Sequence, residues 1–427
     1  MSLAIFLGLL LLLIAIGVPI GFALIVASIG LMFYLDAFGT QLIAQTFIRG
    51  ADSFALLAVP FFILAGELMN AGGISKRIVN FAMIFFGRVK GGLGYVAIFA
   101  SVLFAGLSGS AVADAAALGA ILIPMMAQSG YSKERSAGII ASGSIIAPVI
   151  PPSIPMIIFG VSSGVSITQL FMGGIVPGIL LAFSLAITWW LLIRKNTDFE
   201  LPEKKSFMEI LKVTFDSLLA LLLPVFILVG LRFGVFTPTE AGAMAAFYAL
   251  FLGMFVYREL SIKDLYKVLV SAAKSTAAVM FLVAAAMVSA WLITIANVPV
   301  AFANLLEPLV NNPMLLLFAI ILLVLLLGCV MDITPLILIL TPVLMPVVKM
   351  AGIDPVYFGI IFILTGCIGL LTPPVGTVLT VTSSVAKMKL ESVLKGIWPF
   401  LVAELIVIIV LILFPDIVMV PLGWLTK

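Results

Sequence analysis

Glycines and prolines that interrupt the backbone occur twice along this chain, at one constant separation. Gly106 and Pro151-Pro152 in the first half recur as Gly328 and Pro373-Pro374, each 222 residues later. Since both residue types break regular helices, what repeats is the place where the backbone stops being helical. We interpret each copy as a hydrophobic hairpin that turns back within a membrane, followed by a helix interrupted at a Pro-Pro. Such paired interruptions indicate the binding site of a secondary transporter.

The composition excludes most soluble proteins. Of the 427 residues, 64% are hydrophobic and 10% are charged, which is typical of a polytopic membrane protein. The chain has no histidine, which argues against a metal enzyme or an imidazole relay. Its two cysteines, Cys329 and Cys367, lie in apolar segments and form no CxxC pair, so neither a disulfide framework nor a zinc site is expected. We predict that the protein is not an enzyme, has no cofactor and binds no nucleic acid.

The apolar segments predict an all-α polytopic membrane protein made of two repeats. Each repeat has five transmembrane helices and one re-entrant hairpin, giving about ten spans in a lipid bilayer. The first repeat covers residues 1–193, a cytoplasmic linker covers 194–212, and the second repeat covers 213–427. Scaffold helices are expected at 3–71 and 216–257, the hairpins and broken helices at 93–170 and 314–390, and closing helices at 171–193 and 398–414. The closing helices carry no break, so we assign them to the scaffold.

Three local signals refine this outline. Pro19 should divide the first apolar block into two helices. Thr237-Pro238-Thr239-Glu240 has the pattern of an N-cap, an N1 proline and a capping-box glutamate. Gly72–Gly92 and Arg258–Ser275 mix apolar and basic residues, which is typical of helices lying along a membrane surface, although plain interfacial loops fit equally well.

The basic residues predict the orientation of the repeats. An odd number of spans in each repeat requires that the second be inverted relative to the first. With the N-terminus outside, 18 of the 22 Lys and Arg residues fall on the inner side and four on the outer side, a strong positive-inside bias. Both termini are therefore predicted to be periplasmic.

Four backbone breaks at similar depth imply a shared cavity, because open backbone is tolerated in a membrane only where protein or a cavity surrounds it. Exposed carbonyls there suit Na⁺, and helix N-termini suit a carboxylate substrate. Hydroxyl side chains near the breaks fit both tasks: Ser108, Ser110, Ser142, Ser144, Ser153, Thr334, Thr365, Thr372 and Thr377.

Two acids lie in the hairpins at membrane depth, where an ionisable group is a functional candidate by default. Asp114 and Asp332 could complete a cation site, or each could be a buried group that caps a helix N-terminus. They do not correspond to each other in the repeat. Glu404 lies within the last predicted span, outside the repeated site, and is assigned to a helix contact. Glu67 and Asn70 end the third predicted helix, where they could simply face water.

The interrupted segments resemble those of the large membrane subunit of the TRAP (tripartite ATP-independent periplasmic) transporters, and the resemblance covers essentially the whole chain. Its most specific parts are Gly106-Leu-Ser-Gly-Ser-Ala-Val-Ala-Asp114, Ala147-Pro-Val-Ile-Pro-Pro-Ser153, Phe236-Thr-Pro-Thr-Glu-Ala-Gly242 and Gly369-Leu-Leu-Thr-Pro-Pro-Val-Gly376.

The resemblance implies a Na⁺-coupled importer of organic acids, of the sialic acid or C4-dicarboxylate class, in a bacterial inner membrane. Its partners would be a small four-helix membrane subunit and a periplasmic substrate-binding protein. The mechanism would be of the elevator type. Because no four-helix segment precedes Met1, the small subunit is expected to be a separate chain.

Carried over onto this sequence, the family's Na⁺ sites imply roles for the residues at the breaks. The resemblance places Ser108, Ser110, Gly328, Cys329, Asp332, Gly366 and Thr372 around Na⁺, and we add Gly109 and Asp114 from the first hairpin to this predicted cation-binding set. From their positions at the breaks, the predicted substrate-binding set is Ser144, Pro151, Pro152, Ser153, Thr334, Pro373, Pro374 and Thr377. The alternatives to this function are a self-sufficient Na⁺/dicarboxylate carrier and, from other classes, a membrane-embedded enzyme or a channel.

Overall fold

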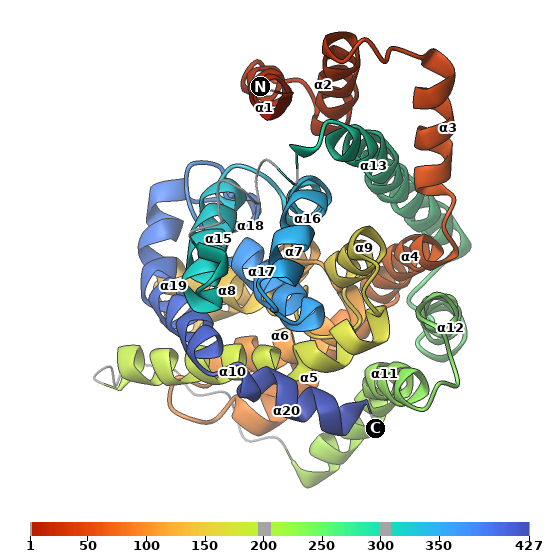
Figure 1. The fold of residues 1–427 in the computed structure, drawn as a ribbon. Coiled ribbons are helices and arrows are strands. Elements are labelled where there is room, and N and C mark those ends of the chain that lie inside the picture. Colours follow the sequence, from red (N-terminus) through yellow and green to blue (C-terminus); the bar gives the residue numbers. More distant parts are fainter. Residues whose placement is uncertain (1, 195–205, 299, 301–308, 427) are drawn as a thin grey trace.

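The protein is all-helical over the residues that its computed structural model describes, which are 2–194, 206–298, 300 and 309–426; no strand occurs among them. The predicted all-α fold is therefore confirmed (Figure 1). Most of the predicted 194–212 linker lies outside the described residues.

The first half begins with helices that precede the hairpin. These are α1 (Ser2–Ala15), α2 (Ile20–Tyr34), α3 (Thr40–Ala51), a 3₁₀ turn (Phe54–Leu57), α4 (Ala58–Ala71) and α5 (Ile74–Phe86). The hairpin consists of α6 (Gly92–Ser108) and α7 (Ala111–Gln128), the broken helix of α8 (Lys133–Ser144) and α9 (Ile154–Ser163), and the closing helix is α10 (Ile167–Ile193). As predicted, Pro19 separates α1 from α2 and stands at the N-cap of α2.

The second half follows the same order. It contains α11 (Phe207–Arg232), α12 (Pro238–Phe251) with a π-helical extension (Leu252–Val256), α13 (Ile262–Ile295), α15 (Pro313–Gly328), α16 (Ile333–Met350), α17 (Pro355–Gly369), α18 (Thr377–Ala386), α19 (Leu390–Leu413) and α20 (Asp416–Leu425). Thr237 and Glu240 form the predicted capping box at the start of α12. The Thr237 amide donates to Glu240 Oε2 at 2.8 Å, and the Glu240 amide donates to Thr237 Oγ1 at 3.3 Å.

The helix bounds follow the 222-residue offset seen in the sequence. Shifted by this amount, α7 coincides with α16, while α6, α8, α9 and α10 fall within three residues of the bounds of their partners α15, α17, α18 and α19. The Pro151-Pro152 and Pro373-Pro374 pairs lie in the two breaks, between α8 and α9 and between α17 and α18. The repeat therefore extends from the Gly and Pro positions to whole helices.

One prediction about the connectors is wrong. Residues Arg258–Ser275 do not form a separate surface segment, because residues from Ile262 onward are the first half of the continuous helix α13. No Gly or Pro occurs between Ile262 and Ile295 to interrupt it. The first-half counterpart of α13 is bent into α3 and α4 by the turn at Asp52 and Ser53.

The other connector, Gly72–Gly92, does contain a helix, α5. The sequence did not predict helices α3 and α20.

The helices pack into two groups (Figure 1). The frame group comprises α1–α5 and α11–α13, in which α13 packs against α2, α3 and α4, and α4 packs against α12. The hairpin group comprises α6–α10 and α15–α20. Its two repeats interlock, because α7 packs on α18, α16 on α9, and α8 on α19. The closing helices α10 and α19 pack on the broken helices, so we count them with the hairpin group, which differs from the sequence-based assignment.

Arg77 joins α5 to other parts of the frame group. Its Nε lies 3.1 Å from Asp216 Oδ2 on α11, and its Nη1 lies 2.7 Å from Glu259 Oε1. The guanidinium also stacks over the Tyr257 ring at 3.6 Å. Burial raises the pKa of Tyr257 to about 12, although the Arg77 charge opposes this shift, so the phenol stays neutral next to the cation.

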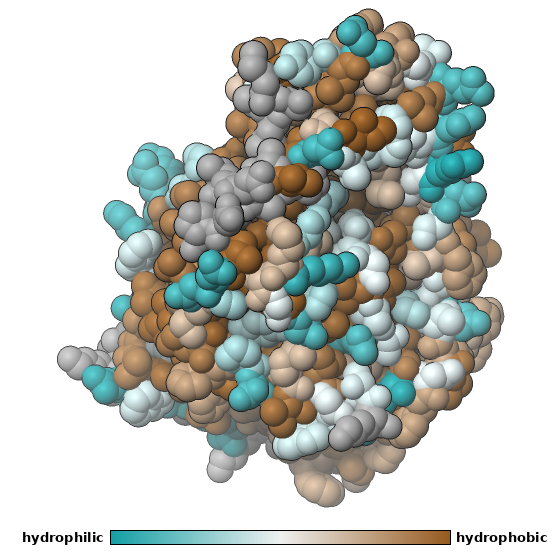
Figure 2. All heavy atoms as spheres, in the orientation of Figure 1, coloured by the Kyte–Doolittle hydropathy of each residue, from teal (hydrophilic) through white to brown (hydrophobic). Residues whose placement is uncertain are grey.

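The outer surface suits a membrane. Among the described residues, eight helices are long and apolar enough to cross one. Large apolar side chains such as Phe183, Phe247 and Trp398 are exposed, and much of the face in Figure 2 is hydrophobic. Such contiguous apolar surface is unfavourable in water and is covered by lipid in a membrane. The number of crossings and the inversion of the repeats stay predictions.

Candidate functional site

The first hairpin tip is a tight turn between α6 and α7. Gly109 turns the chain with φ of 59°, a conformation that favours glycine. Ser110 is the N-cap of α7, and its Oγ accepts a hydrogen bond from the Ala113 amide at 3.4 Å. Ser108 Oγ accepts from the Ser110 amide at 3.2 Å and donates to a carboxyl oxygen of Asp114, which is fully buried. Hydroxyl and carboxylate oxygens are thus concentrated at this tip.

The first tip packs directly on the first break. A Cβ added at Gly109 would lie 2.6 Å from the Pro152 carbonyl oxygen, so the two backbones touch. Ser153 is the N-cap of α9; its Oγ donates to the Pro148 carbonyl at 2.5 Å and accepts from the Met156 amide at 3.2 Å. Ser144 donates to the Ala141 carbonyl within α8. We call this assembly the first cluster, comprising Ser108–Ser110, Asp114 and Pro151–Ser153.

The second hairpin tip packs on the second break in the same way. A Cβ added at Gly328 would lie 3.2 Å from Gly369 Cα and 3.3 Å from the Gly366 carbonyl oxygen. The Cys329 carbonyl accepts from the amides of Val375 and Gly376 at 3.0 and 3.2 Å. Tip and break are therefore joined by backbone contacts that leave no room for larger side chains.

Asp332 is the polar centre of this second assembly. It caps α16, with Oδ1 accepting from the Thr334 amide at 3.3 Å and Oδ2 accepting from Thr377 Oγ1 at 3.4 Å. Thr372 donates to the Ile368 carbonyl at 3.0 Å. The second cluster comprises Gly328, Cys329, Asp332, Gly366 and Thr372–Thr377, which includes Pro373 and Pro374. Asp332 lies 222 residues after Ser110, so the two residues are equivalent in the repeat. Each is the polar N-cap of the second helix of its hairpin, Ser110 for α7 and Asp332 for α16.

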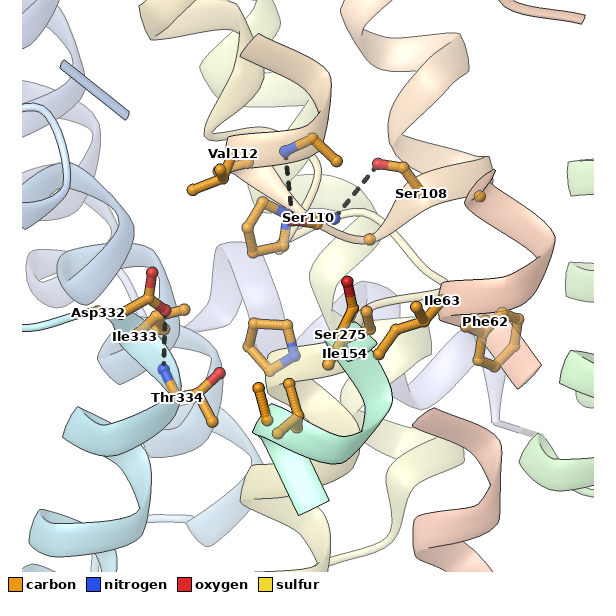
Figure 3. A pocket seen from close by; sticks show the side chains of 18 of the residues that line it. Phe62, Ile63, Ser108, Ser110, Val112, Ile154, Ser275, Asp332, Ile333 and Thr334 are labelled. Atoms are coloured by element: carbon orange, nitrogen blue, oxygen red, sulfur yellow. Dashed lines mark hydrogen bonds between the residues drawn. The ribbon is translucent and has the colours of Figure 1, made fainter. Parts of the chain in front are cut away.

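A cavity of about 440 Å³ lies between the clusters and the frame group. The first tip contributes Ser108–Ala113 and the second contributes Asp332–Pro335, with Pro148, Ile154, Pro155 and Leu370 from the breaks. Figure 3 shows Ser108 and Ser110 on one side of it and Asp332 and Thr334 on another. Of the predicted site residues, Ser108, Gly109, Ser110, Asp332 and Thr334 line the cavity, and the others lie outside its lining.

The opposite wall, which sequence reasoning missed, comes from α4 and α13. It includes Phe62, Ile63, Gly66, Glu67 and Asn70 from α4, and Ser275, Ala278, Val279 and Leu282 from α13. Glu67 Oε1 accepts from Ser271 Oγ on α13 at 3.0 Å. Glu67 and Asn70 both line the cavity, a position that the sequence did not indicate. Their spacing of three residues on one apolar helix was the available signal.

The described lining of the cavity lacks the positively charged side chains that commonly bind anions. Among the described residues that line it, none is Lys, Arg or His, and the acids are Glu67 and Asp332. The N-termini of three helices, α7, α9 and α16, converge on it instead, as their first residues line the cavity. Unpaired amides at helix N-termini carry partial positive charge and bind anions. The described residues contain no group of three metal-ligating side chains.

The fold and this site define a multi-span membrane protein of the transporter class. A family model described as "Tripartite ATP-independent periplasmic transporter, DctM component" matches residues 7–417. The chain therefore belongs to this family, and the resemblance inferred from the interrupted motifs is confirmed.

Individual relatives agree with this assignment. The 2,3-diketo-L-gulonate TRAP transporter large permease protein YiaN of Escherichia coli K12 is 54% identical over 426 residues, which cover 99% of this chain and 100% of the relative. The sialic acid TRAP transporter large permease protein SiaM of Vibrio cholerae is 40% identical and covers 94% and 93%. The C4-dicarboxylate TRAP transporter large permease protein DctM of Pseudomonas aeruginosa is 37% identical and covers 88% of each chain.

One solved structure has the same fold. The Alcanivorax borkumensis YdaH transporter, described as having an unusual topology, aligns with a TM-score of 0.62. The alignment covers 93% of this chain and 90% of that one, at 16% sequence identity. At this identity the likeness extends to the fold alone.

Proposed function

We propose that this chain is the transport-carrying large subunit of a Na⁺-driven organic-acid importer in a bacterial inner membrane. The observation that carries the proposal is the cavity itself, where two hairpin tips and two broken helices converge. Helix N-termini facing the cavity would hold a substrate carboxylate. Exposed carbonyl, hydroxyl and carboxylate oxygens of the first and second clusters would hold Na⁺, a hard cation that prefers oxygen ligands.

The chemistry of the cavity favours a substrate with one carboxylate and several hydroxyl groups. A second carboxylate would meet no Lys or Arg among the described lining residues, and Glu67 would repel it. Glu67, Asn70 and Ser275 could instead accept or donate hydrogen bonds to hydroxyl groups. Two relatives are named for 2,3-diketo-L-gulonate and sialic acid, which are acids of this kind. We therefore favour a sugar acid over a C4-dicarboxylate.

The assembly would contain two further proteins. A small membrane subunit and a periplasmic substrate-binding protein complete the transporters of this family, and we propose that both serve this chain. The termini would be periplasmic, in keeping with the 18-to-4 distribution of basic residues. Transport would occur by sliding of the hairpin group against the frame group.

Uptake in proteoliposomes tests the proposal. The chain would be reconstituted with its small subunit and supplied with candidate binding proteins loaded with radiolabelled 2,3-diketogulonate, sialic acid or succinate. We expect accumulation of a sugar acid under an inward Na⁺ gradient and none under an equal K⁺ gradient. Accumulation that ignores Na⁺ would refute the coupling, and uptake without a binding protein would favour the self-sufficient carrier.

A cavity variant separates substrate choice from coupling. Glu67→Gln removes the negative charge and keeps a hydrogen-bonding side chain of the same shape. We expect a higher relative uptake of succinate in this variant, with Na⁺ dependence unchanged. Identical selectivity in the variant and the wild-type protein would exclude Glu67 as a determinant.

A further inference from the structure

A buried carboxyl group lies in the hairpin group, and the proposed transport site leaves it unexplained. Glu404 on α19 has no exposed surface, and neither of its carboxyl oxygens has a hydrogen-bond partner among the described residues. Ser142 on α8 is the polar side chain that faces it; its hydroxyl is also fully buried, and the two side chains interact without forming a hydrogen bond of regular geometry. Buried polar groups are nearly always satisfied, so two unsatisfied groups facing each other require an explanation.

The helices around this pair approach too closely to separate easily. Where Gly138 on α8 faces Gly396 on α19, a Cβ added at Gly138 would lie 2.2 Å from the Gly396 carbonyl oxygen. Ser142 follows Gly138 by one turn along α8, and Glu404 follows Gly396 by two turns along α19. The pair therefore lies in the seam between two helices whose backbones touch at Gly138 and Gly396.

The internal repeat shows that this seam does not need an acid. By the 222-residue offset, Glu404 corresponds to Ala182 on α10 and Ser142 corresponds to Leu364 on α17. These helices also pack against each other, yet their side chains at the two positions are apolar. The equivalent helices therefore pack without an acid at this position, which argues against the helix-contact role assigned to Glu404 from the sequence.

Among the described residues, no Lys or Arg forms an ion pair with Glu404. Helices α8, α10, α15, α17 and α18 pack against α19. Their titratable side chains are Lys133, Glu134 and Arg135 at the start of α8, and Tyr357 and Cys367 on α17. Tyr357 donates to the Leu411 carbonyl at 2.8 Å, and Cys367 lies within electrostatic range of Glu404. On α19 itself, Glu391 and Lys395 lie at least two turns away.

An unpaired carboxylate at membrane depth is costly, so a bound cation must neutralise it. The described side chains here offer three oxygens, two from Glu404 and one from Ser142. A metal cation needs a fuller oxygen shell, whereas a proton needs one lone pair. We infer that Glu404 and Ser142 form a proton-binding site inside the hairpin group, separate from the clusters proposed for Na⁺.

Infrared difference spectroscopy of the purified chain tests this inference without transport, so it can succeed or fail independently of the proposed function. The wild-type spectrum minus that of Glu404→Gln should contain the carbonyl band of one protonated carboxyl group at neutral pH. Glu391→Gln, which alters an exposed acid at the start of the same helix, should remove only ionised carboxylate bands. Carboxylate bands in place of the protonated band for Glu404 would overturn the site.

A second variant tests the contribution of Ser142. Ser142→Ala keeps the acid and removes the facing hydroxyl, so the protonated band should move to the frequency of a less hydrogen-bonded carboxyl group. A band that stays unchanged would exclude Ser142 from the site. This measurement keeps the inference testable if Glu404→Gln does not fold.

Discussion

Replacing Asp332 by Asn separates two roles that this side chain could have in the second cluster. Asp332 caps α16 by accepting from the Thr334 amide at 3.3 Å, and it accepts from Thr377 at 3.4 Å. Asn and Asp are equally good N-cap residues, so Asp332→Asn keeps the cap while it removes the negative charge. A purely structural Asp332 should therefore tolerate the change.

A cation role has a predictable magnitude. A unit charge about 4 Å from bound Na⁺ is worth about 4 kcal/mol at an effective dielectric constant of about 20. The amide oxygen of Asn still offers one ligand, so we expect roughly half of this to be lost. A loss of about 2 kcal/mol weakens Na⁺ binding about thirtyfold. The assay is the Na⁺ concentration that gives half-maximal uptake in proteoliposomes.

Asp354 provides a matched control for this experiment. It caps α17 by accepting from the amides of Val356 and Tyr357 at 2.8 and 2.9 Å, and it does not line the cavity. Asp354→Asn makes the same chemical change at the same kind of helix position. If Asp332→Asn shifts the Na⁺ requirement no more than Asp354→Asn does, the charge of Asp332 has no part in binding the cation.

Three further predictions follow from packing, charge and topology. Gly396→Ala places a methyl group 1.8 Å from the Glu134 carbonyl, and since no rotamer relieves a backbone clash, we expect a loss of about 1–3 kcal/mol, checked by thermal unfolding in detergent; an unchanged midpoint would contradict it. Arg77→Met should cost about 1 kcal/mol through its half-exposed ion pairs, and the difference from wild type should shrink at high salt. Cysteines at Lys204 and Asn311 should react with impermeant reagents from opposite sides of the membrane, and labelling from one side would refute the inverted repeat.

The sequence predicted best those features that single residues determine locally. Pro19 and the Pro-Pro pairs fix helix ends through their own backbone chemistry, and Thr237 and Glu240 form a cap within one turn. The 222-residue offset extended these local signals to the arrangement of whole helices.

Features that depend on packing between distant segments were not predicted. The wall of the cavity that contains Glu67 and Ser275 exists because α4 and α13 meet, 204 residues apart at the Glu67–Ser271 hydrogen bond. The sequence did not indicate that Asp332 and Ser110 are equivalent, because the two side chains differ and share only their role as helix N-caps. Basic residues suggested a surface segment before Ser275, although nothing in that stretch could end a helix.

The distribution of hydrogen bonds supports sliding of the hairpin group along the frame group. Within the frame group, side chains of Ser28, Arg77 and Thr239 bond to distant helices of the same group. Hydrogen bonds also form where α5 leads into α6 and at the C-terminal end of α10. Apart from these, a single side-chain hydrogen bond joins the frame group to the hairpin group among the described residues. It runs from Arg232 Nη2 to the Trp424 carbonyl and is 3.5 Å long. Directional polar contacts between the groups are therefore few, and non-directional packing contacts can be exchanged more easily than hydrogen bonds.

Cross-links distinguish this sliding from rocking of one repeat against the other. The rings of Phe86 on α5 and Phe99 on α6 lie 5.2 Å apart across the boundary between the groups. Gly119 on α7 and Val385 on α18 touch within the hairpin group but belong to different repeats. If the hairpin group slides as one body, a bond between cysteines at 86 and 99 should abolish uptake, and a bond between cysteines at 119 and 385 should be tolerated. Rocking predicts that the second bond blocks uptake, because it locks the two repeats together, so loss of transport in that variant alone would refute sliding.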